Sequence, residues 1–148
     1  MLFLYLYSYQ NLKFKPKTEY NYRPMSWDII IFSSKQKIDA IEELDHRQLV
    51  PVDFCEILET HFESIIKNEN HREINGEDFT IDYYTDDELV SNKLFNLYGE
   101  RGLYELISLA KLRNWQIFDS GIGCMIDLDN PENNGYLNFK NYLNQIKG

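Results

Sequence analysis

The sequence predicts an α+β fold, in which a small antiparallel or mixed sheet packs with about three helices. Apolar residues recur every three or four positions in some segments, as on one face of a helix. In other segments they alternate with polar residues or form short β-branched runs, which indicates strands. The resulting order is β-α-ββ-α-ββ-α, and strands that pair locally between helices favour α+β over an all-parallel sheet.

The first half of this order begins with a strand at 27–32, a short Ile-rich run. Residues 35–50 fit a short helix or an irregular crossing equally well. A clearer helix follows, because Asp53 can cap it and Glu56 stands three residues later, as in a capping box. We expect this helix to continue to about 68–70, since five apolar residues recur along it at spacings of three and four: Cys55, Leu58, Phe62, Ile65 and Ile66.

The middle of the chain contains a turn signal, Asn-Gly at 75–76, followed by a strand at 79–84. In that strand Phe79, Ile81 and Tyr83 alternate with Thr80, Asp82 and Tyr84, so we assign the first three to the core and the others to the opposite face. An exposed acidic loop, 86–88, separates it from a strand at 94–98. A second helix is expected over 103–114.

The last third predicts a β-hairpin and a terminal helix. Two apolar runs, 115–118 and 124–128, flank a glycine-containing loop at 119–123. Apolar spacing over 136–146 then predicts the helix. The first elements of the chain resemble the split βαβ pattern of ferredoxin-like folds.

The first 24 residues differ in composition from the rest. They hold five of the eleven tyrosines, and their lysines follow the apolar run instead of preceding it, which does not fit a signal peptide. A compact domain would begin naturally at Met25. We therefore expect a single domain over 25–148 and a non-domain extension over 1–24, which translation from a wrong start site would explain. The alternative is a short membrane-associating or edge-strand arm.

The chain is strongly acidic, with 15 basic and 24 acidic residues among 148 and a formal net charge of −9. Residues 1–24 contain four of the basic residues and one of the acidic ones, so the part from Met25 carries −12. Such a charge repels phosphate backbones and anionic membrane surfaces, which argues against nucleic-acid and membrane partners. It would attract and steer a basic protein.

The two cysteines, Cys55 and Cys124, are too few for a disulfide framework, and we expect buried free thiols. No secretory signal is visible, and no run of about 20 apolar residues could span a membrane. The expected location is therefore the cytoplasm.

No pattern for catalysis, a metal or a cofactor is found. The three histidines, His46, His61 and His71, form no zinc-type pair with each other or with a cysteine. The Gly-Ile-Gly at 121–123 precedes a strand, whereas a phosphate-binding loop opens a helix. An oxygen-rich stretch loosely resembles the start of a calcium loop and consists of Asp127, Asp129, Asn130, Glu132 and Asn133. Pro131 interrupts it, so we expect Asp129 and Asn130 to be turn and capping residues before the terminal helix.

Four segments carry a resemblance to known proteins: MSWDIIIF at 25–32, GEDFTIDYY at 76–84, NLYGERGLYELI at 96–107 and NWQIFDSGIGCMIDLDNPENNGYLNF at 114–139. Through them the chain resembles a group of small, uncharacterised bacterial proteins. These in turn resemble the immunity-like partners that are encoded beside secreted bacterial toxins. The resemblance implies a toxin-neutralising protein and transfers no catalytic residue.

Together these features favour a protein-binding module whose partner is a basic protein such as a toxin domain, in which case the chain is an immunity protein. The expected contact residues share one strand and the loop after it: Asp82, Tyr84, Asp86, Asp87 and Glu88. The alternative is a small enzyme or ligand-binding protein that uses a carboxylate of the 119–129 hairpin, namely Asp119, Asp127 or Asp129. The oligomeric state is left open.

Overall fold

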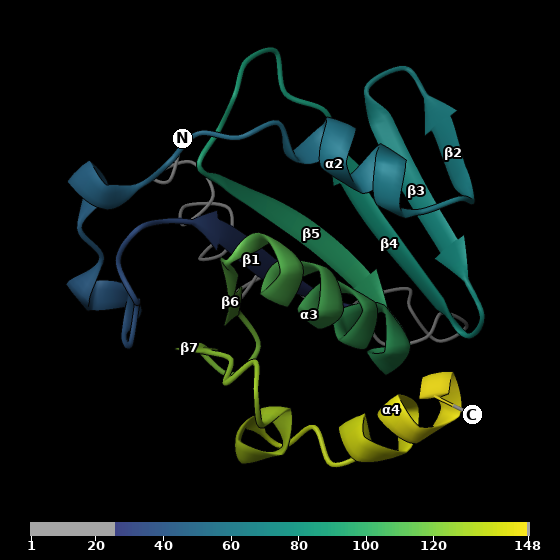
Figure 1. The fold of residues 1–148 in the computed structure, drawn as a ribbon. Coiled ribbons are helices and arrows are strands. Elements are labelled where there is room, and N and C mark those ends of the chain that lie inside the picture. The colour runs from purple at the N-terminus through teal and green to yellow at the C-terminus, as the bar shows by residue number, and fades with distance from the viewer. Residues whose placement is uncertain (1–25, 148) are drawn as a thin grey trace, which may run out of the picture.

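A computed structural model describes residues 26–147, so the prediction for residues 1–24 lies outside the described part of the chain. The described residues form one seven-stranded sheet with helices (Figure 1). The strands are β1 (Ser26–Ser33), β2 (Ile65–Asn68), β3 (His71–Gly76), β4 (Phe79–Tyr84), β5 (Asn92–Tyr98), β6 (Trp115–Asp119) and β7 (Cys124–Met125). The helices are α2 (Phe54–His61), α3 (Glu100–Arg113) and α4 (Phe139–Lys147), with 3₁₀ turns η1 (Ile41–Glu43), η2 (His46–Gln48) and η3 (Pro131–Asn134). The α+β prediction is confirmed.

The strands lie in the order β2-β3-β4-β5-β1-β6-β7, and each described pair of neighbours is antiparallel. The central strand β1 pairs with both β5 and β6, so that Ile30 faces Leu94 on one side and Phe118 on the other. Strands β1 and β4 are each antiparallel to β5, which lies between them, so β1 and β4 run parallel to each other, and α2 lies in the connection that joins them. Two parallel strands separated by an inserted antiparallel strand form the split βαβ pattern, so the resemblance of the first elements to ferredoxin-like folds is confirmed.

The helix predicted from Asp53 is shorter than expected. Asp53 does cap it, accepting a hydrogen bond from the backbone N–H of Glu56 at 3.0 Å, but α2 ends at His61. Ile65 begins β2 instead, which pairs with β3 through a tight turn in which Glu69 adopts a φ of 55°. The apolar spacing at this point fits a helix and a strand equally well, because Ile65 faces the core in the observed strand and would also face it in the predicted helix.

The observed order is thus β-α-ββββ-α-ββ-α, with β2 and β3 added to the prediction. Strands β4, β5 and β6, helix α3 and the β6–β7 hairpin occur where they were expected, within two or three residues. The turn between β3 and β4 is Glu77-Asp78, two residues beyond the predicted Asn-Gly signal, because Gly76 pairs with Phe79 inside the ladder.

The main core lies between the sheet and helices α2 and α3, which cover one face of it (Figure 1). Helix α4 packs against the N-terminal half of α3, where the ring of Tyr104 lies 5.2 Å from that of Phe139 and 5.3 Å from that of Tyr142. None of the described helices is long and apolar enough to cross a membrane.

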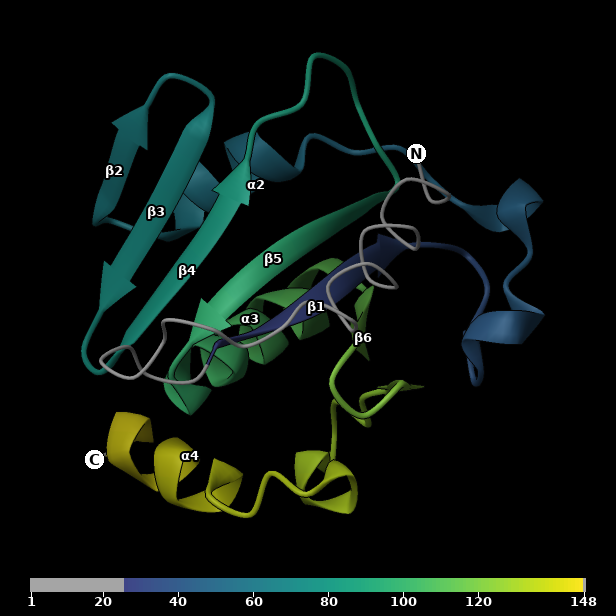
Figure 2. The ribbon, with the colours of Figure 1, turned by 180° about the vertical axis from the view of Figure 1, so that it is seen from behind.

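The opposite face of the sheet is divided into two halves. On the half formed by β1 and β6, the irregular segment 34–50 covers a small second core that contains Ile30, Phe32 and Phe118. This explains why residues 29–32 of β1 form an uninterrupted apolar run, since both faces of the strand are buried there. Over the half formed by β3, β4 and β5, the described chain places no helix (Figure 2).

A glycine fixes how α3 meets the sheet. Gly99 ends β5 with a φ of 92°, a conformation that side chains with a Cβ rarely adopt. A Cβ at this position would also lie 2.3 Å from the carbonyl oxygen of Asp78 in the β3–β4 turn. Glycine is therefore required for the turn that directs the chain from β5 into α3.

Candidate binding surface

The predicted alternation of β4 is confirmed by the structure. Phe79, Ile81 and Tyr83 are 9%, 0% and 2% exposed and belong to the main core. Asp82 and Tyr84 lie on the opposite face of the strand, which is the half of the sheet without a described helix. Two of the five predicted contact residues are therefore neighbours on one sheet face.

The same face is polar across three strands. Cross-strand pairs bring β3 and β4 side chains together, with Glu73 opposite Asp82 and His71 opposite Tyr84. On the next strand, β5, Asn96 stands opposite Asp82. We call this the polar face and define it as His71, Glu73, Asn75, Thr80, Asp82, Tyr84 and Asn96.

Hydrogen bonds between neighbouring side chains hold the polar face in place. Thr80 Oγ1 donates to Asn75 Oδ1 at 3.0 Å, and Asn75 Nδ2 donates to Glu73 Oε2 at 2.9 Å. Asn96 Nδ2 donates to a carboxylate oxygen of Asp28 on β1 at 2.7 Å. A carboxylate can accept several hydrogen bonds, so these contacts orient Glu73 and leave it further acceptor capacity.

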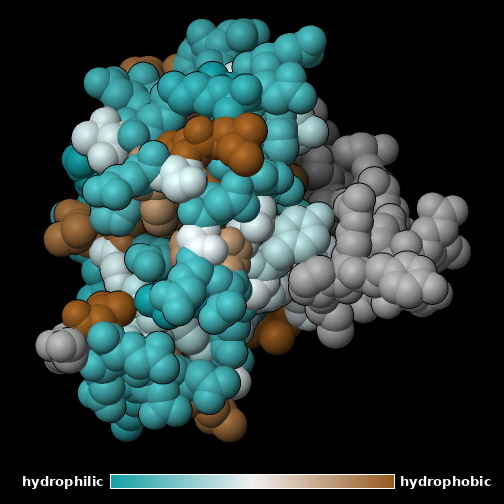
Figure 3. All heavy atoms as spheres, turned by 90° about the vertical axis from the view of Figure 1, so that its right-hand side faces the viewer, coloured by the Kyte–Doolittle hydropathy of each residue, from teal (hydrophilic) through white to brown (hydrophobic). Residues whose placement is uncertain are grey.

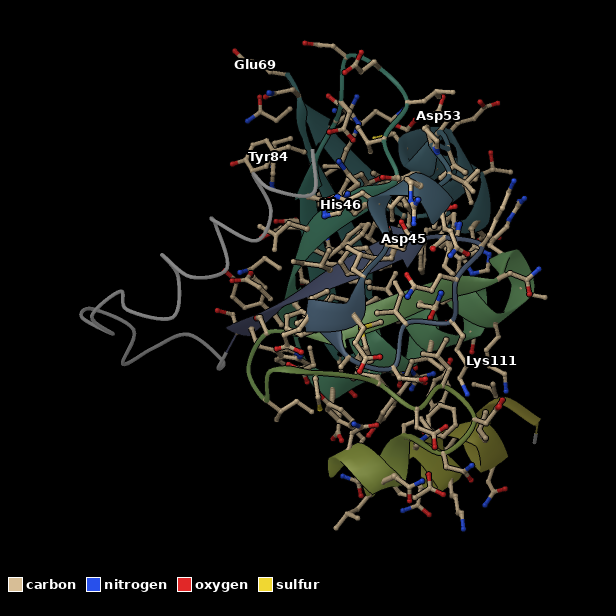
Figure 4. The ribbon with its side chains drawn as sticks, turned by 90° about the vertical axis from the view of Figure 1, so that its left-hand side faces the viewer. Asp45, His46, Asp53, Glu69, Tyr84 and Lys111 are labelled. Atoms are coloured by element: carbon tan, nitrogen blue, oxygen red, sulfur yellow. The ribbon has the colours of Figure 1, made fainter. Side chains whose placement is uncertain are left out.

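Tyr84 is the large exposed side chain of the polar face. It is 61% exposed, and its ring lies 5.2 Å from the ring of His71. His71 Nε2 is in turn 3.5 Å from Asp82 Oδ1. Figure 4 shows Tyr84 on one side of the sheet and Asp53, the cap of α2, on the other. An exposed aromatic ring flanked by polar groups is the kind of residue that dominates protein interfaces.

The acidic loop after β4 is exposed in part only. Asp87 and Glu88 are exposed, as predicted, and so is Leu89 at 56%. Asp86 differs, because its carboxylate lies 2.7 Å from the ammonium of Lys93, and its side chain is 16% exposed. The prediction that Asp86 belongs to a solvated acidic run is therefore wrong.

Lys93 explains the position of Asp86. It lies on β5 with 2% exposure, and its ammonium donates to the carboxylate of Asp86 and to the carbonyl oxygen of Tyr84. The ammonium also lies 5.7 Å from the ring centre of Tyr83. A buried ammonium is tolerated when it is paired and hydrogen-bonded, so Asp86 serves as its counter-charge.

The same contacts fix both ends of the loop 85–91. At its start, Asp86 is held by Lys93. At its end, Val90 forms an isolated β-bridge with Val52, and the N–H of Ser33 donates to the carbonyl oxygen of Ser91 at 2.8 Å. The exposed tip, Asp87 to Leu89, therefore projects from a fixed base beside the polar face.

The carboxylates of the alternative site, the 119–129 hairpin, have structural partners. Asp119 is 2% exposed, accepts the hydroxyl of Tyr136, and accepts the N–H of Gly121 at 2.8 Å. Burial and the Asp119 carboxylate raise the pKa of Tyr136 well above its usual value. Asp129 forms an ion pair with Lys111 at 3.1 Å.

Asp127 closes a turn in this stretch. Its Oδ1 accepts the N–H of Asp129 at 3.1 Å and of Asn130 at 3.0 Å. Asn130, which was expected to cap the terminal helix, instead precedes η3 and makes no capping hydrogen bond through its side chain. The hydrogen bonds from Asn130 and Asn133 lower the pKa of the Asp127 carboxyl. Among the described residues, no group of three or more histidine, cysteine or acidic side chains could hold a metal ion.

A hollow of about 650 Å³ lies beside this hairpin, between the segment 34–39 and residues 125–129. Its rim carries charges of both signs, with Lys35 and Lys37 on one segment and Asp127 and Asp129 on the other. It is lined by irregular segments and by the start of β6, so it lies away from the polar face of β3 to β5.

The cysteines and two histidines contribute to neither surface. Both cysteines are free; Cys55 is half-buried, and burial raises the pKa of its thiol. Cys124 is exposed, which contradicts the expectation of a buried thiol, because β7 is a two-residue edge strand. His46 and His61 are exposed on separate elements.

Sequence reasoning missed several residues of the polar face. Residues 71–74 were assigned to no element and residues 75–76 to a turn, although His71, Glu73 and Asn75 show the period-two pattern of a strand face. Lys93 was missed because a lysine at the start of an apolar run suggests a solvated strand end. The pairing of Lys93 with Asp86 depends on burial, which the sequence does not show.

Comparison of the chain with family models, curated proteins and solved structures finds no match.

Proposed function

We propose that the protein is a binding module for a basic protein, and that the polar face together with the tip Asp87 to Leu89 forms its contact surface. The observation that carries the proposal is the contrast between the two faces of β4. One face packs into the main core, and the other presents oriented polar side chains around the exposed ring of Tyr84. The resemblance noted in the sequence extends the proposal to a toxin-neutralising immunity protein.

The charge of the chain supports a basic partner. Part of the negative charge behind the net −9 lies at this surface, on Glu73 and Asp82 of the polar face and on Asp87 and Glu88 of the tip. Opposite charge accelerates encounter and excludes acidic competitors, and the effect weakens as salt screens it.

Rigidity of the surface supports the same function. The side chains of Glu73 and Asn75 are held by neighbours, and the loop 85–91 is fixed at both ends. A surface that is ordered before binding loses less conformational entropy when a partner docks. Docking a partner therefore costs less conformational entropy at Glu73, at Asn75 and in the backbone of the loop 85–91.

The hollow beside the hairpin supports the second candidate, a small-ligand site. Its volume falls in the range of ligand sites, about 300–1,000 Å³. Its carboxylates are already used, however, because Asp127 holds a turn and Asp129 pairs with Lys111. For this reason we place protein binding first.

The test is a kinetic comparison of variants against the isolated partner. The double variant Asp87→Asn/Glu88→Gln should lower the association rate several-fold at low salt and much less at high salt. Tyr84→Ala should raise the dissociation rate about tenfold, as loss of an aromatic anchor does.

The matched control removes the same charge elsewhere. Glu42 and Glu43 are exposed on η1, so Glu42→Gln/Glu43→Gln has the same net charge as the double variant of the tip. Equal rates for the two double variants would show that only net charge matters, and would remove the tip from the interface. An unchanged dissociation rate in Tyr84→Ala would remove the polar face.

A further inference from the structure

Three carboxylates and one amide lie in a row across four neighbouring strands of the sheet. Glu73 on β3 is paired with Asp82 on β4. Asn96 on β5 is paired with Asp82 on one side and with Asp28 of β1 on the other. Paired residues of antiparallel strands carry their side chains on the same face of the sheet. We call these four residues the acidic row; it crosses the polar face and ends on β1.

The acidic row is rich in hydrogen-bond acceptors. Glu73 accepts a hydrogen bond from the side chain of Asn75, and Asp28 accepts one from that of Asn96. Both donors are neutral amides, and a carboxylate can accept several hydrogen bonds. The amide oxygen of Asn96 is buried and accepts no hydrogen bond from the described residues. Because a buried acceptor without a donor costs free energy, the row favours an occupant that supplies N–H groups.

The surface around the row is hydrophilic. Figure 3 views the molecule from the β2–β3 edge of the sheet, where hydrophilic side chains cover most of the described surface. Most of the row lies on the half of the sheet over which the described chain places no helix (Figure 2). An occupant of this half is therefore held by charge and hydrogen bonds more than by apolar contact.

The chain ahead of β1 carries the complementary charge. Residues 1–25 lie outside the described part of the chain, and they contain four basic residues and one acidic residue. Residues 26–148 contain 11 basic and 23 acidic ones. The two parts of the chain, with +3 and −12, therefore attract each other.

The lysines of this segment are spaced to meet a sheet face. Lys13, Lys15 and Lys17 occupy alternate positions, and Pro16 favours extended backbone at the residue before it. In extended backbone, side chains at alternate positions point to the same side. The three ammonium groups would then meet one surface together.

We propose that residues 13–17 dock across the polar face, with their three lysines over the acidic row. The row spans three strand spacings, about 14 Å, and the first and last of five extended residues lie about 13 Å apart. Residues 18–25 connect the segment to β1, which carries Asp28, and a connection of this length reaches up to about 26 Å. So short a connection keeps the segment at a high effective concentration near the face, and weak charge contacts then suffice.

The proposal gives the extension a role, which translation from a wrong start site would not. It also implies that a basic partner must displace residues 13–17 to reach the polar face. That implication rests on the proposed function, whereas the docking rests only on the charges of the two parts of the chain. The docking is therefore tested without a partner.

The first experiment is cross-linking of the full chain with a water-soluble carbodiimide, followed by peptide mass spectrometry of the monomer. The reagent joins a lysine amine to a carboxylate in contact with it: an amide bond forms, and the water that is lost converts the carbodiimide to a urea. We expect links from the three lysines of the segment to Glu73, Asp82 or Asp28. High salt should reduce these links several-fold, because it screens the attraction.

Two internal references calibrate the cross-linking yield. The ion pair of Lys67 with Glu59, at 3.0 Å, should be linked in every sample and shows that the reagent is active. Glu42 and Glu43 are exposed on η1 and report random contact with the segment. They should be linked to residues 13–17 at least fivefold less than the acidic row is.

The second experiment compares backbone amide chemical shifts of two full-length triple variants. Neutralising the segment, in Lys13→Gln/Lys15→Gln/Lys17→Gln, should shift the amides of the acidic row and its neighbours in β3, β4 and β5. The matched control removes the same charge from exposed side chains of η2, α3 and α4 and should leave those amides unchanged. It is Arg47→Gln/Arg113→Gln/Lys140→Gln.

Absence of links between residues 13–17 and the acidic row, while Lys67 is linked to Glu59, would overturn the proposal. So would links that reach Glu42 and Glu43 equally often, or amides of the row that do not respond to the triple variant of the segment. A native protein whose N-terminal sequence begins at Met25 would lack the occupant and would overturn the proposal as well.

Discussion

Removal of the Asp86 carboxylate tests the structural account of the acidic loop. Asp86→Asn leaves the ammonium of Lys93, which is 2% exposed, without its counter-charge. Breaking a buried ion pair by removing one partner costs about 3–5 kcal/mol. Because the Asp86 side chain is 16% exposed and Lys93 keeps its hydrogen bond to the carbonyl oxygen of Tyr84, we expect the lower end, about 3 kcal/mol.

The assay is thermal and urea unfolding at neutral pH. A loss of about 3 kcal/mol should lower the melting temperature by about 6–12 °C for a chain of this length. Asp87→Asn and Glu88→Gln are the controls, since both side chains are exposed, and each should stay within about 0.5 kcal/mol of the parent. The assay thus compares the stability lost on substituting neighbouring carboxylates of one acidic run.

A second substitution separates loss of charge balance from loss of packing. In Asp86→Asn/Lys93→Met the uncompensated buried charge is gone, and that charge is the main cost of breaking a buried pair. The double variant should therefore recover at least half of the stability lost in Asp86→Asn. If Asp86→Asn costs no more than Asp87→Asn, or if the double variant is less stable than the single one, the assignment of Asp86 as counter-charge is refuted.

Three further predictions concern the supports of the sheet. Burial acts to raise the pKa of Glu59, but hydrogen bonds from Lys67 and Arg72 and their charges outweigh it and lower that pKa. The contribution of the Glu59 carboxylate to folding stability is therefore complete above about pH 4.5 and is lost as pH falls through the lowered pKa. Glu59→Gln should flatten this acid dependence of the unfolding free energy, measured by urea titrations at several pH values. Tyr136→Phe removes a donor from the buried carboxylate of Asp119 and should cost about 1–3 kcal/mol, with faster amide exchange in α4; unchanged exchange would contradict the role of this bond in holding the C-terminal segment. Gly99→Ala should destabilise the protein by more than about 1 kcal/mol in the same unfolding assay, and a neutral result would mean that the β5–α3 turn can relax.

Local patterns predicted most elements of the fold, and the errors have a common physical cause. The stripe from Cys55 to Ile66 fits a helix, yet the chain leaves the helix after His61, because β2 has a partner in β3. Periodicity reports which side chains face the core, and Ile65 faces it in both structures. The choice between helix and strand is made by long-range pairing, which a single sequence does not display.

The turn between β3 and β4 shows the same limit. Asn75-Gly76 is a strong turn signal, but Gly76 is needed inside the ladder, because a Cβ there would meet the ring of Phe79 at 2.1 Å. The turn falls on Glu77-Asp78, where Asp78 adopts a φ of 65°. A glycine required for close packing can thus be mistaken for one required by a turn.

The candidate surface was predictable where it follows from alternation along one strand. Asp82 and Tyr84 were placed correctly because side chains alternate in β4, and Asp87 and Glu88 are exposed as expected. Asp86 was misplaced because its partner lies seven residues away on a strand whose lysine is buried. Similar side chains in one acidic run can therefore have different roles, and only the packing distinguishes them.

The central claim, that the polar face and the loop tip bind a basic protein, is tested most directly by backbone amide chemical shifts of the protein with and without its isolated partner. The account predicts that the perturbed amides cluster in β3, β4 and residues 85–89, and that Tyr84→Ala removes most of the effect. Perturbations centred on α3 and α4, or on the hollow between 34–39 and 125–129, would contradict it.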